Sequence, residues 1–341
     1  MPYRFLTLIN LTILLAILFQ GCTTNPLDIN VSKVEVPPVK ISRLEQQVFQ
    51  SPQKSAQELH DQLQQQYGTL YLGFQSVINT VYPDSSALFN LEMFRHDTIM
   101  QAVYAATQKK FPDLTELEND ITNIHKHFKY YFPNRFLPKV VSYISGFNFR
   151  QFPVDSTIGI SLEMYLGSTS RFYQMIQFPH YQTLTMNPIN IPTDYAQGWM
   201  MTIFPRKFEK KDLLSEMIYN GKILYLVDAL LPTQTDSMKI NYSAKQLKWC
   251  QQNEYNMWAF FIQKKLLYET NPAEIVKYTG DGPFTAAFNK ESPSRVGNYL
   301  GWMIVRSYMK HHPKTTLEQL MAITNGQTLL NESHYKPNKT S

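Results

Sequence analysis

Cysteine is scarce in this chain. Among 341 residues there are two cysteines, Cys22 and Cys250. No C-x-x-C pair and no cysteine–histidine spacing of a zinc site occurs, which excludes the common cysteine-based metal and redox sites. Cys250 lies between apolar residues, so we expect a buried, unpaired thiol that packs as a small hydrophobic side chain. If Cys22 carries lipid, the mature chain has no intramolecular disulfide.

Several recurrent catalytic and nucleotide-binding motifs are also missing. The sequence has no G-x-S-x-G, no Walker loop and no G-x-G-x-x-G. The net charge of +5 is spread along the chain without a dense run of lysine and arginine. No trustworthy nucleic-acid-binding motif is present. We therefore expect no cofactor and no nucleic-acid partner.

Apolar runs that approach the length of a membrane span are lacking, apart from one at the N-terminus. There Phe5 to Phe19 follows Arg4 and precedes Gly21-Cys22. The run is short for a membrane span, and a small residue before a lone cysteine is typical of a bacterial lipoprotein signal. We predict a signal peptide over 1–21 and lipid on Cys22 that anchors the chain to a membrane. The alternative is an ordinary secretory signal or an uncleaved anchor.

The polar stretch after Cys22 predicts a tether. Residues 22–38 end in Pro37-Pro38, and the remaining 39–341 have enough hydrophobic sequence for a single globular domain. Thr23 stands where an acidic residue would retain a lipoprotein in the inner membrane. The outer membrane, with the domain facing the periplasm, is therefore the expected location.

Hydrophobic periodicity predicts an α+β fold that is predominantly helical, with one small sheet. Strands are expected near 39–44, 139–144 and 157–162. Helices are expected at 55–67, 97–109, 114–128, 193–204, 212–230, 243–269, 292–312 and 317–324, followed by an irregular tail.

The segment Ser292–His312 is the best-marked helix. Ser292 is a suitable N-cap, and Pro293 suits the first helical position. Gly297 and Gly301 fall on one face, which indicates that another backbone packs there at close range, because glycine in a helix interior costs about 1 kcal/mol. We interpret this helix as core.

Two further stretches invite a functional interpretation. His125 and His127 lie two apart on a predicted helix, so they cannot chelate one ion together and are expected at the surface. Basic and aromatic residues alternate from Lys126 to Arg135, which could bind a polymer. A helix end, a turn and a strand are favoured there instead.

Six blocks of the chain resemble the GldB-type gliding-motility lipoproteins of Bacteroidota. They are KYYFPNRFLPKVVSYISGF (129–147), IGISLEMYLG (158–167), MIYNGKILYLVDALLP (217–232), WCQQNEYNMWAFFIQKKLLY (249–268), RVGNYLGWMIVRSYM (295–309) and SHYKP (333–337). The match departs from the expected pattern at Glu163, where an aspartate nearer the strand end is expected. The resemblance implies an envelope lipoprotein required for gliding, with protein partners in the gliding and type IX secretion apparatus.

The order of elements also resembles zincin metallopeptidases. Such enzymes need H-E-x-x-H on one helix, because two histidines at i and i+4 bind one Zn²⁺. The corresponding helix begins near Pro192 and contains no histidine, and Asn220-Gly221 stands where a third ligand would be. The nearest histidine, His180, lies in a Pro-flanked loop. The resemblance therefore implies a degenerate zincin-like scaffold with no metal ligands.

Two functions remain open from the sequence. The favoured one is a non-enzymatic envelope component that binds protein partners, with no catalytic residues. The alternative is a cell-wall or peptide hydrolase with a non-standard site, in which Asp194 and Glu216 act as an acidic pair.

Overall fold

A four-stranded mixed sheet lies at the centre of the computed structural model, which describes residues 25–81 and 86–339. The strands lie in the order β1-β2-β4-β3, with β1, β2 and β4 parallel and β3 antiparallel to β4. Their bounds are β1 Ile41–Arg43, β2 Lys139–Tyr143, β3 Gln151–Val154 and β4 Thr157–Ser161. The predicted α+β class is confirmed, and β3 was not predicted.

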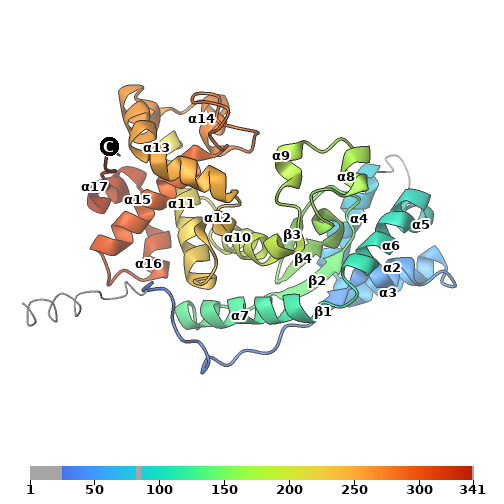
Figure 1. The fold of residues 1–341 in the computed structure, drawn as a ribbon. Helices are drawn as coiled ribbons and strands as arrows, with labels where there is room; N and C mark the ends of the chain where they lie inside the picture. The colour runs from blue at the N-terminus through green and yellow to red at the C-terminus, as the bar shows by residue number, and fades with distance from the viewer. Residues whose placement is uncertain (1–24, 82–85, 340–341) are drawn as a thin grey trace, which may run out of the picture.

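Hydrophobic cores cover both faces of this sheet. Successive residues of a strand point to opposite faces, so Val140 packs into one cluster while Val141 and Tyr143 pack into another. Helices of the first third of the chain build the second, smaller cluster (Figure 1). They are α2 Leu44–Phe49, α3 Ala56–Tyr67, α4 Thr69–Val81, α5 Ala87–His96 and α6 Thr98–Lys110.

The larger cluster is built mainly by residues of the C-terminal two thirds of the chain. Figure 1 shows the helices from α11 onward, yellow to red, to one side of the sheet, with α7 running along the base. The long helices are α7 Thr115–Tyr131, α10 Ile191–Ile203, α11 Leu213–Leu230, α13 Ala244–Gln263 and α15 Val296–His311. Shorter helices are α8 Arg171–Met175, α9 His180–Thr183, α12 Asp236–Lys239, α14 Pro272–Thr279, α16 Leu317–Ala322 and α17 Gly326–Ser333.

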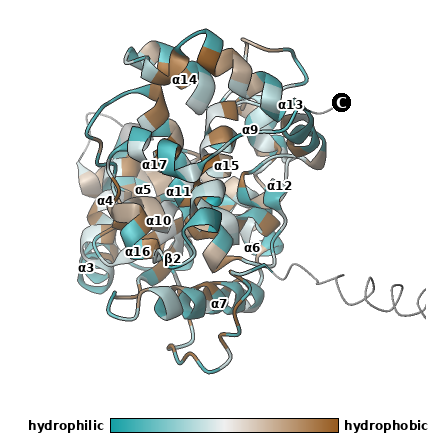
Figure 2. Ribbon diagram, turned by 90° about the vertical axis from the view of Figure 1, so that its left-hand side faces the viewer, coloured by the Kyte–Doolittle hydropathy of each residue, from teal (hydrophilic) through white to brown (hydrophobic). Residues whose placement is uncertain are grey.

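Side-chain caps explain where several predicted helices begin. Ser55 accepts a hydrogen bond from the backbone N–H of Glu58, and the Glu58 carboxylate accepts one from the backbone N–H of Ser55. Ser243 and Gln246 form the same reciprocal pair at the start of α13, and the Asp212 carboxylate accepts a hydrogen bond from the backbone N–H of Ser215 at the start of α11. Figure 2 shows the contrast between the largely hydrophilic α3 and the more hydrophobic helices inside the molecule.

The predicted start of the helix near Ser292 is wrong. The helix begins at Val296, because Arg295 adopts a φ of 58° and interrupts the helical backbone. The Ser292 hydroxyl donates to the carbonyl oxygens of Asn289 and Thr285 and does not cap the helix. Arg295 and Lys265, with a φ of 54°, are both left-handed, and Lys265 ends the predicted helix 243–269 early.

The predicted surface position of His125 and His127 is also wrong. Both are buried, and the Nε2 of His125 lies 2.7 Å from the hydroxyl of Tyr195 on α10. Burial lowers the pKa of His125 to about 4, so the ring is neutral. His127 contacts the carbonyl oxygen of Asn123 through Nδ1. His125 therefore belongs to the core between α7 and α10, while His127 is buried elsewhere along α7.

The two ends of the described chain are bound to the domain. Residues expected to form an irregular tail make α17, which packs against α15, and the Tyr335 hydroxyl donates to Glu254. At the other end, the described part of the predicted tether has no helix or strand, and Leu27 packs against the larger core. The amide of Asn25 donates to the carbonyl oxygen of Pro232.

Candidate binding cleft

Asp194 lies in the first turn of α10, and its carboxylate accepts hydrogen bonds from three other segments of the chain. Its Oδ2 accepts hydrogen bonds from Arg150 (3.1 Å) and from the Tyr165 hydroxyl (2.9 Å). Its Oδ1 accepts one from the Asn241 amide (2.8 Å). Arg150 also donates to the carbonyl oxygen of Gln182. Because both carboxylate oxygens are engaged and the charge is neutralised by Arg150, Asp194 fits a structural role better than that of a general base.

Glu216 occupies a separate environment on α11. Its Oε1 accepts hydrogen bonds from Arg206 (3.0 Å) and Asn220 (3.3 Å). It lines a surface pocket with Arg206 and Asp212, whereas two partners of Asp194, Arg150 and Asn241, line a different one. The two carboxylates share no partner, so the contacts do not support the acidic pair of the hydrolase hypothesis.

The positions compared with zinc ligands hold other contacts. The Asn220 amide donates to Glu216 and to Asn298 of α15, which links two buried helices. His180 is exposed at the start of α9. Within residues 25–81 and 86–339, no three histidine, cysteine or acidic side chains are grouped to hold a metal ion. Cys250 is buried and free, as predicted.

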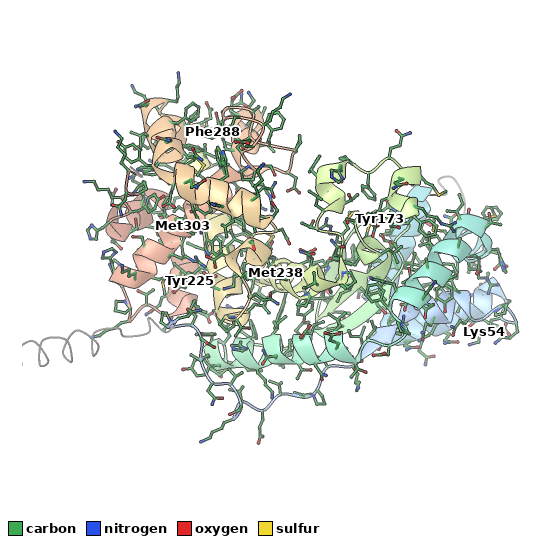
Figure 3. All side chains as sticks on the ribbon, viewed as in Figure 1. Lys54, Tyr173, Tyr225, Met238, Phe288 and Met303 are labelled. Carbon is green, nitrogen blue, oxygen red and sulfur yellow. The ribbon has the colours of Figure 1, made fainter. Side chains whose placement is uncertain are left out.

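A cleft of about 620 Å³ opens beside the Asp194 cluster. One wall comes from the turn before β3 and from the segment around α9, and the other comes from α12, the start of α13 and the loop before α15. Met238, labelled in Figure 3, belongs to the second wall. Aromatic and amide side chains predominate, with three charges among them. They include Phe147, Phe149, Phe178, Tyr181 and Tyr242, Asn148, Gln182, Asn190, Gln197, Asn241 and Gln246, and Arg150, Asp281 and Arg295.

Three residues that line this cleft have a left-handed backbone. Phe147, Asn241 and Arg295 have φ values of 67°, 57° and 58°. Asparagine tolerates the left-handed region, but phenylalanine and arginine rarely adopt it. The Arg295 guanidinium donates to the carbonyl oxygens of Ile240 and Asn241 and pairs with Asp281 (3.1 Å). Such strain persists only where surrounding contacts hold it, and it is commonly found at functional sites.

Glu163 organises the turn that carries the aromatic wall. It is fully buried, and its Oε1 accepts hydrogen bonds from the N–H and hydroxyl of Ser145 (2.7 and 2.6 Å) and from the N–H of Phe147 (3.2 Å). Burial raises its pKa to about 7. The acidic residue at which the chain departs from the expected family pattern therefore has a structural role.

Comparison with known families identifies the chain. The family model described as gliding motility protein GldB matches residues 24–337. The chain belongs to the GldB family. No curated protein and no solved structure matches it, so the likeness to a zincin scaffold stays a prediction.

GldB proteins are gliding-motility lipoproteins, and this fits a membrane-anchored chain. In the described part of this GldB chain, no helix has the length and apolar character needed to cross a membrane. The predicted lipidation residue, Cys22, and the signal peptide lie outside the described residues. Lipid on Cys22 therefore stays a prediction.

Sequence reasoning had identified Asp194 and Glu216 but missed the cleft around Asp194. Its lining residues come from segments far apart in the chain, among them Phe149, Arg150, Asn241 and Arg295. Arg150 precedes the unpredicted strand β3. Arg295 begins the family block 295–309, which lies in the segment that the sequence indicated as core.

Proposed function

We propose that this chain is a lipid-anchored envelope component that supports gliding by binding a protein partner, and that it is not an enzyme. The anchor is lipid on Cys22, in the outer membrane, with residues 39–341 forming one domain in the periplasm. The partner belongs to the gliding and type IX secretion apparatus.

One observation carries the non-enzymatic part of this proposal. Asp194 adjoins the cleft through Arg150 and Asn241, and both of its oxygens are held by Arg150, Tyr165 and Asn241. Asp281, the acidic residue of the lining, pairs with Arg295 at 3.1 Å. A general base needs a free oxygen within reach of the proton it removes. The contacts favour a carboxylate that fixes the cleft walls.

The lining of the cleft favours a polypeptide as its occupant. Exposed aromatic and aliphatic side chains supply apolar contact area, with 48% of Phe149 and 47% of Leu184 exposed. The surrounding amides can both donate to and accept from a peptide backbone. Large aromatic residues beside arginine are enriched at protein interfaces.

Site-specific photocrosslinking in the native host tests this proposal. A photoreactive phenylalanine analogue replaces Phe149 in the cleft or, as a matched control, Phe136, which is 90% exposed and lies outside the residues that line it. We expect one discrete adduct with a gliding-apparatus protein from position 149 and none from position 136. Absence of that adduct at 149, or the same adduct at both positions, would contradict the proposal.

A further inference from the structure

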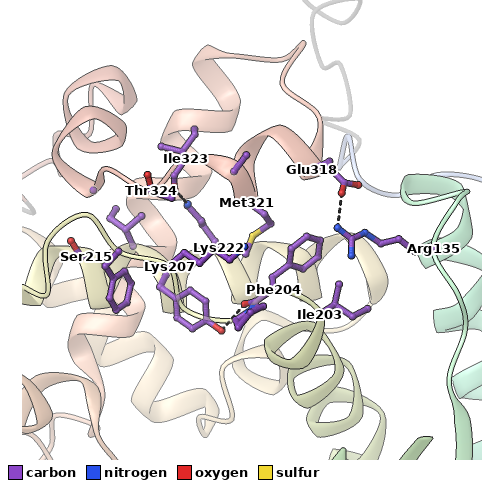
Figure 4. A pocket seen from close by; sticks show the side chains of 16 residues that line it. Arg135, Ile203, Phe204, Lys207, Ser215, Lys222, Glu318, Met321, Ile323 and Thr324 are labelled. Atoms are coloured by element: carbon purple, nitrogen blue, oxygen red, sulfur yellow. Dashed lines mark hydrogen bonds and ion pairs between the residues drawn. The ribbon is translucent and has the colours of Figure 1, made fainter. Parts of the chain in front are cut away.

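A second cavity, separate from the cleft, lies between α10, α11 and α16. Its volume is about 370 Å³, and Figure 4 shows its lining side chains. Cavities that bind small molecules typically have at least about 300 Å³ and a mainly apolar lining with a few polar groups. Here the apolar wall comes from the end of α10, the following loop, α11 and α16. It comprises Ile203, Phe204, Phe208, Ile218, Met321 and Ile323.

Lys222 is a buried cation in the wall of this cavity. It projects from α11, only 5% of it is exposed, and its ammonium group donates to the carbonyl oxygen of Ile323 at the end of α16 (Figure 4). Among the residues that the structure describes, no carboxylate pairs with Lys222. Removing a charge from water without a counter-ion is costly. Consistent with this, burial lowers the pKa of Lys222 to about 8.

The other charged groups of the lining leave an excess of positive charge. Glu318 pairs with Arg135 at 2.6 Å, and the Arg135 guanidinium lies over the ring of Phe204 at 4.6 Å. Lys207 lies on the loop after α10. The one carboxylate of the lining is therefore engaged by Arg135, while Lys222 and Lys207 are not matched by an acidic side chain of the lining.

Capping of α16 accounts for only part of the role of Lys222. A cation near the carbonyl end of a helix is stabilising. However, α16 is short, and the group that Lys222 contacts, the Ile323 carbonyl, carries no formal charge that would balance the ammonium group. An ammonium group has three donors, and one of them is used by Ile323. The remaining donors and the full positive charge are available to an anion in the cavity.

We propose that this cavity binds a small organic anion, with its carboxylate at the ammonium group of Lys222 and its alkyl body against Phe204, Phe208 and Met321. Nothing in this proposal depends on the protein-binding function of the cleft. An alkyl carboxylate satisfies both halves of the cavity, since a neutral amphiphile leaves the buried charge unmatched and an inorganic anion leaves the apolar wall unfilled.

Binding of octanoate to the full-length protein in lipid nanodiscs tests the proposal. The bound carboxylate is followed by the ¹³C chemical shift of carboxyl-labelled octanoate, and empty nanodiscs correct for partition into lipid. Octanol is the neutral probe with the same chain. The variant is Lys222→Met, which keeps an unbranched side chain and removes the charge. Lys248→Met, at an exposed position of α13, is the matched control.

We expect saturable binding of octanoate to the wild type and to Lys248→Met, weakened about tenfold or more in Lys222→Met, because a hydrogen bond to a charged group is lost. Octanol should bind weakly and equally to all three. A second variant, Ala322→Trp, adds bulk at an exposed lining position while Lys222 is kept, and it should also weaken octanoate binding. No saturable binding to the wild type, or equal binding to the wild type and both cavity variants, would overturn the proposal.

Discussion

Gly221 of α11 and Gly301 of α15 meet backbone to backbone where the two helices cross. A methyl group built on Gly221 would overlap the carbonyl group of Gly301, and one built on Gly301 would overlap the carbonyl group of Met217. The close approach inferred from the spacing of Gly297 and Gly301 is therefore confirmed, and its partner is α11.

Replacing Gly301 with alanine should destabilise the fold. Alanine gains about 1 kcal/mol of helix propensity over glycine, but the overlap with a helix backbone cannot be relieved by a side-chain rotation. We expect a net loss of about 2 kcal/mol in the free energy of unfolding, measured in urea. Gly297→Ala should cost less, because its added methyl would lie 3.0 Å from the Tyr278 carbonyl oxygen.

Gly282→Ala is the control for this series, since its added methyl would meet nothing closer than 3.7 Å. It should leave stability almost unchanged. Equal stability of Gly301→Ala and Gly282→Ala would show that the helices do not pack as closely as described.

Asp228 should be the most stabilising carboxylate of the larger core. It is buried on α11 and contacts Arg306 (2.7 Å), Lys239 (3.1 Å) and the indole N–H of Trp302 (2.9 Å). Asp228→Asn leaves the buried Lys239 without its charge partner and removes one of the two carboxylates that pair with Arg306. We expect a loss of about 3–5 kcal/mol in the free energy of unfolding.

Asp236→Asn is a matched variant, because Asp236 pairs with the same Arg306 at 2.6 Å but has 35% of its side chain exposed. Solvent screening should keep its cost to about 1 kcal/mol or less. Similar losses for the two variants would argue against the burial of Asp228.

Glu163 should make the folded protein less stable as the pH rises, whereas a carboxylate with a lowered pKa makes it more stable. Its pKa rises from 4.5 to about 7 on burial, so the folded protein binds the proton more tightly than the unfolded chain. This contribution is complete below pH 4.5 and is lost as the pH rises through 7. The stability of the wild type relative to Glu163→Gln should therefore fall by about 1 kcal/mol per pH unit across this range.

The wild type has to be compared with Glu163→Gln because His125 also changes stability over the same pH range. Its pKa is lowered from 6.5 to about 4, so its contribution is lost as the pH falls through this range and partly cancels that of Glu163 in the wild type. A difference between wild type and Glu163→Gln that stays constant from pH 4.5 to 7 would contradict the raised pKa of Glu163.

Local sequence signals predicted much of the helical part of the fold. Ser55, Asp212 and Ser243 are side-chain caps, and each marks the start of a helix that the structure contains. The misplaced helix ends lie at Arg295 and Lys265, whose left-handed backbone has no sequence signal, because long charged side chains seldom adopt it.

Non-local contacts were the part that the sequence could not supply. Strand β3 contains Pro153, which argues against a central strand but is compatible with the edge position that it occupies. A polar residue such as His125 is expected at the surface, yet the Tyr195 hydroxyl, seventy residues away in the chain, gives its ring a hydrogen-bond partner in the core. The cleft and the Lys222 cavity likewise depend on loops and helices that meet only after folding.

The gliding speed of a deletion strain tests most directly whether this GldB protein acts by binding and not by catalysis. The strain is complemented with Asp194→Asn plus Glu216→Gln, or with Phe149→Arg plus Leu184→Arg, and protein levels are matched by immunoblot. Phe136→Arg serves as the control for an added surface charge. We predict normal gliding for the carboxamide pair and the control, and loss of gliding for the two arginines in the cleft. Loss of gliding in the carboxamide pair together with normal gliding of the cleft variant would contradict the proposed function.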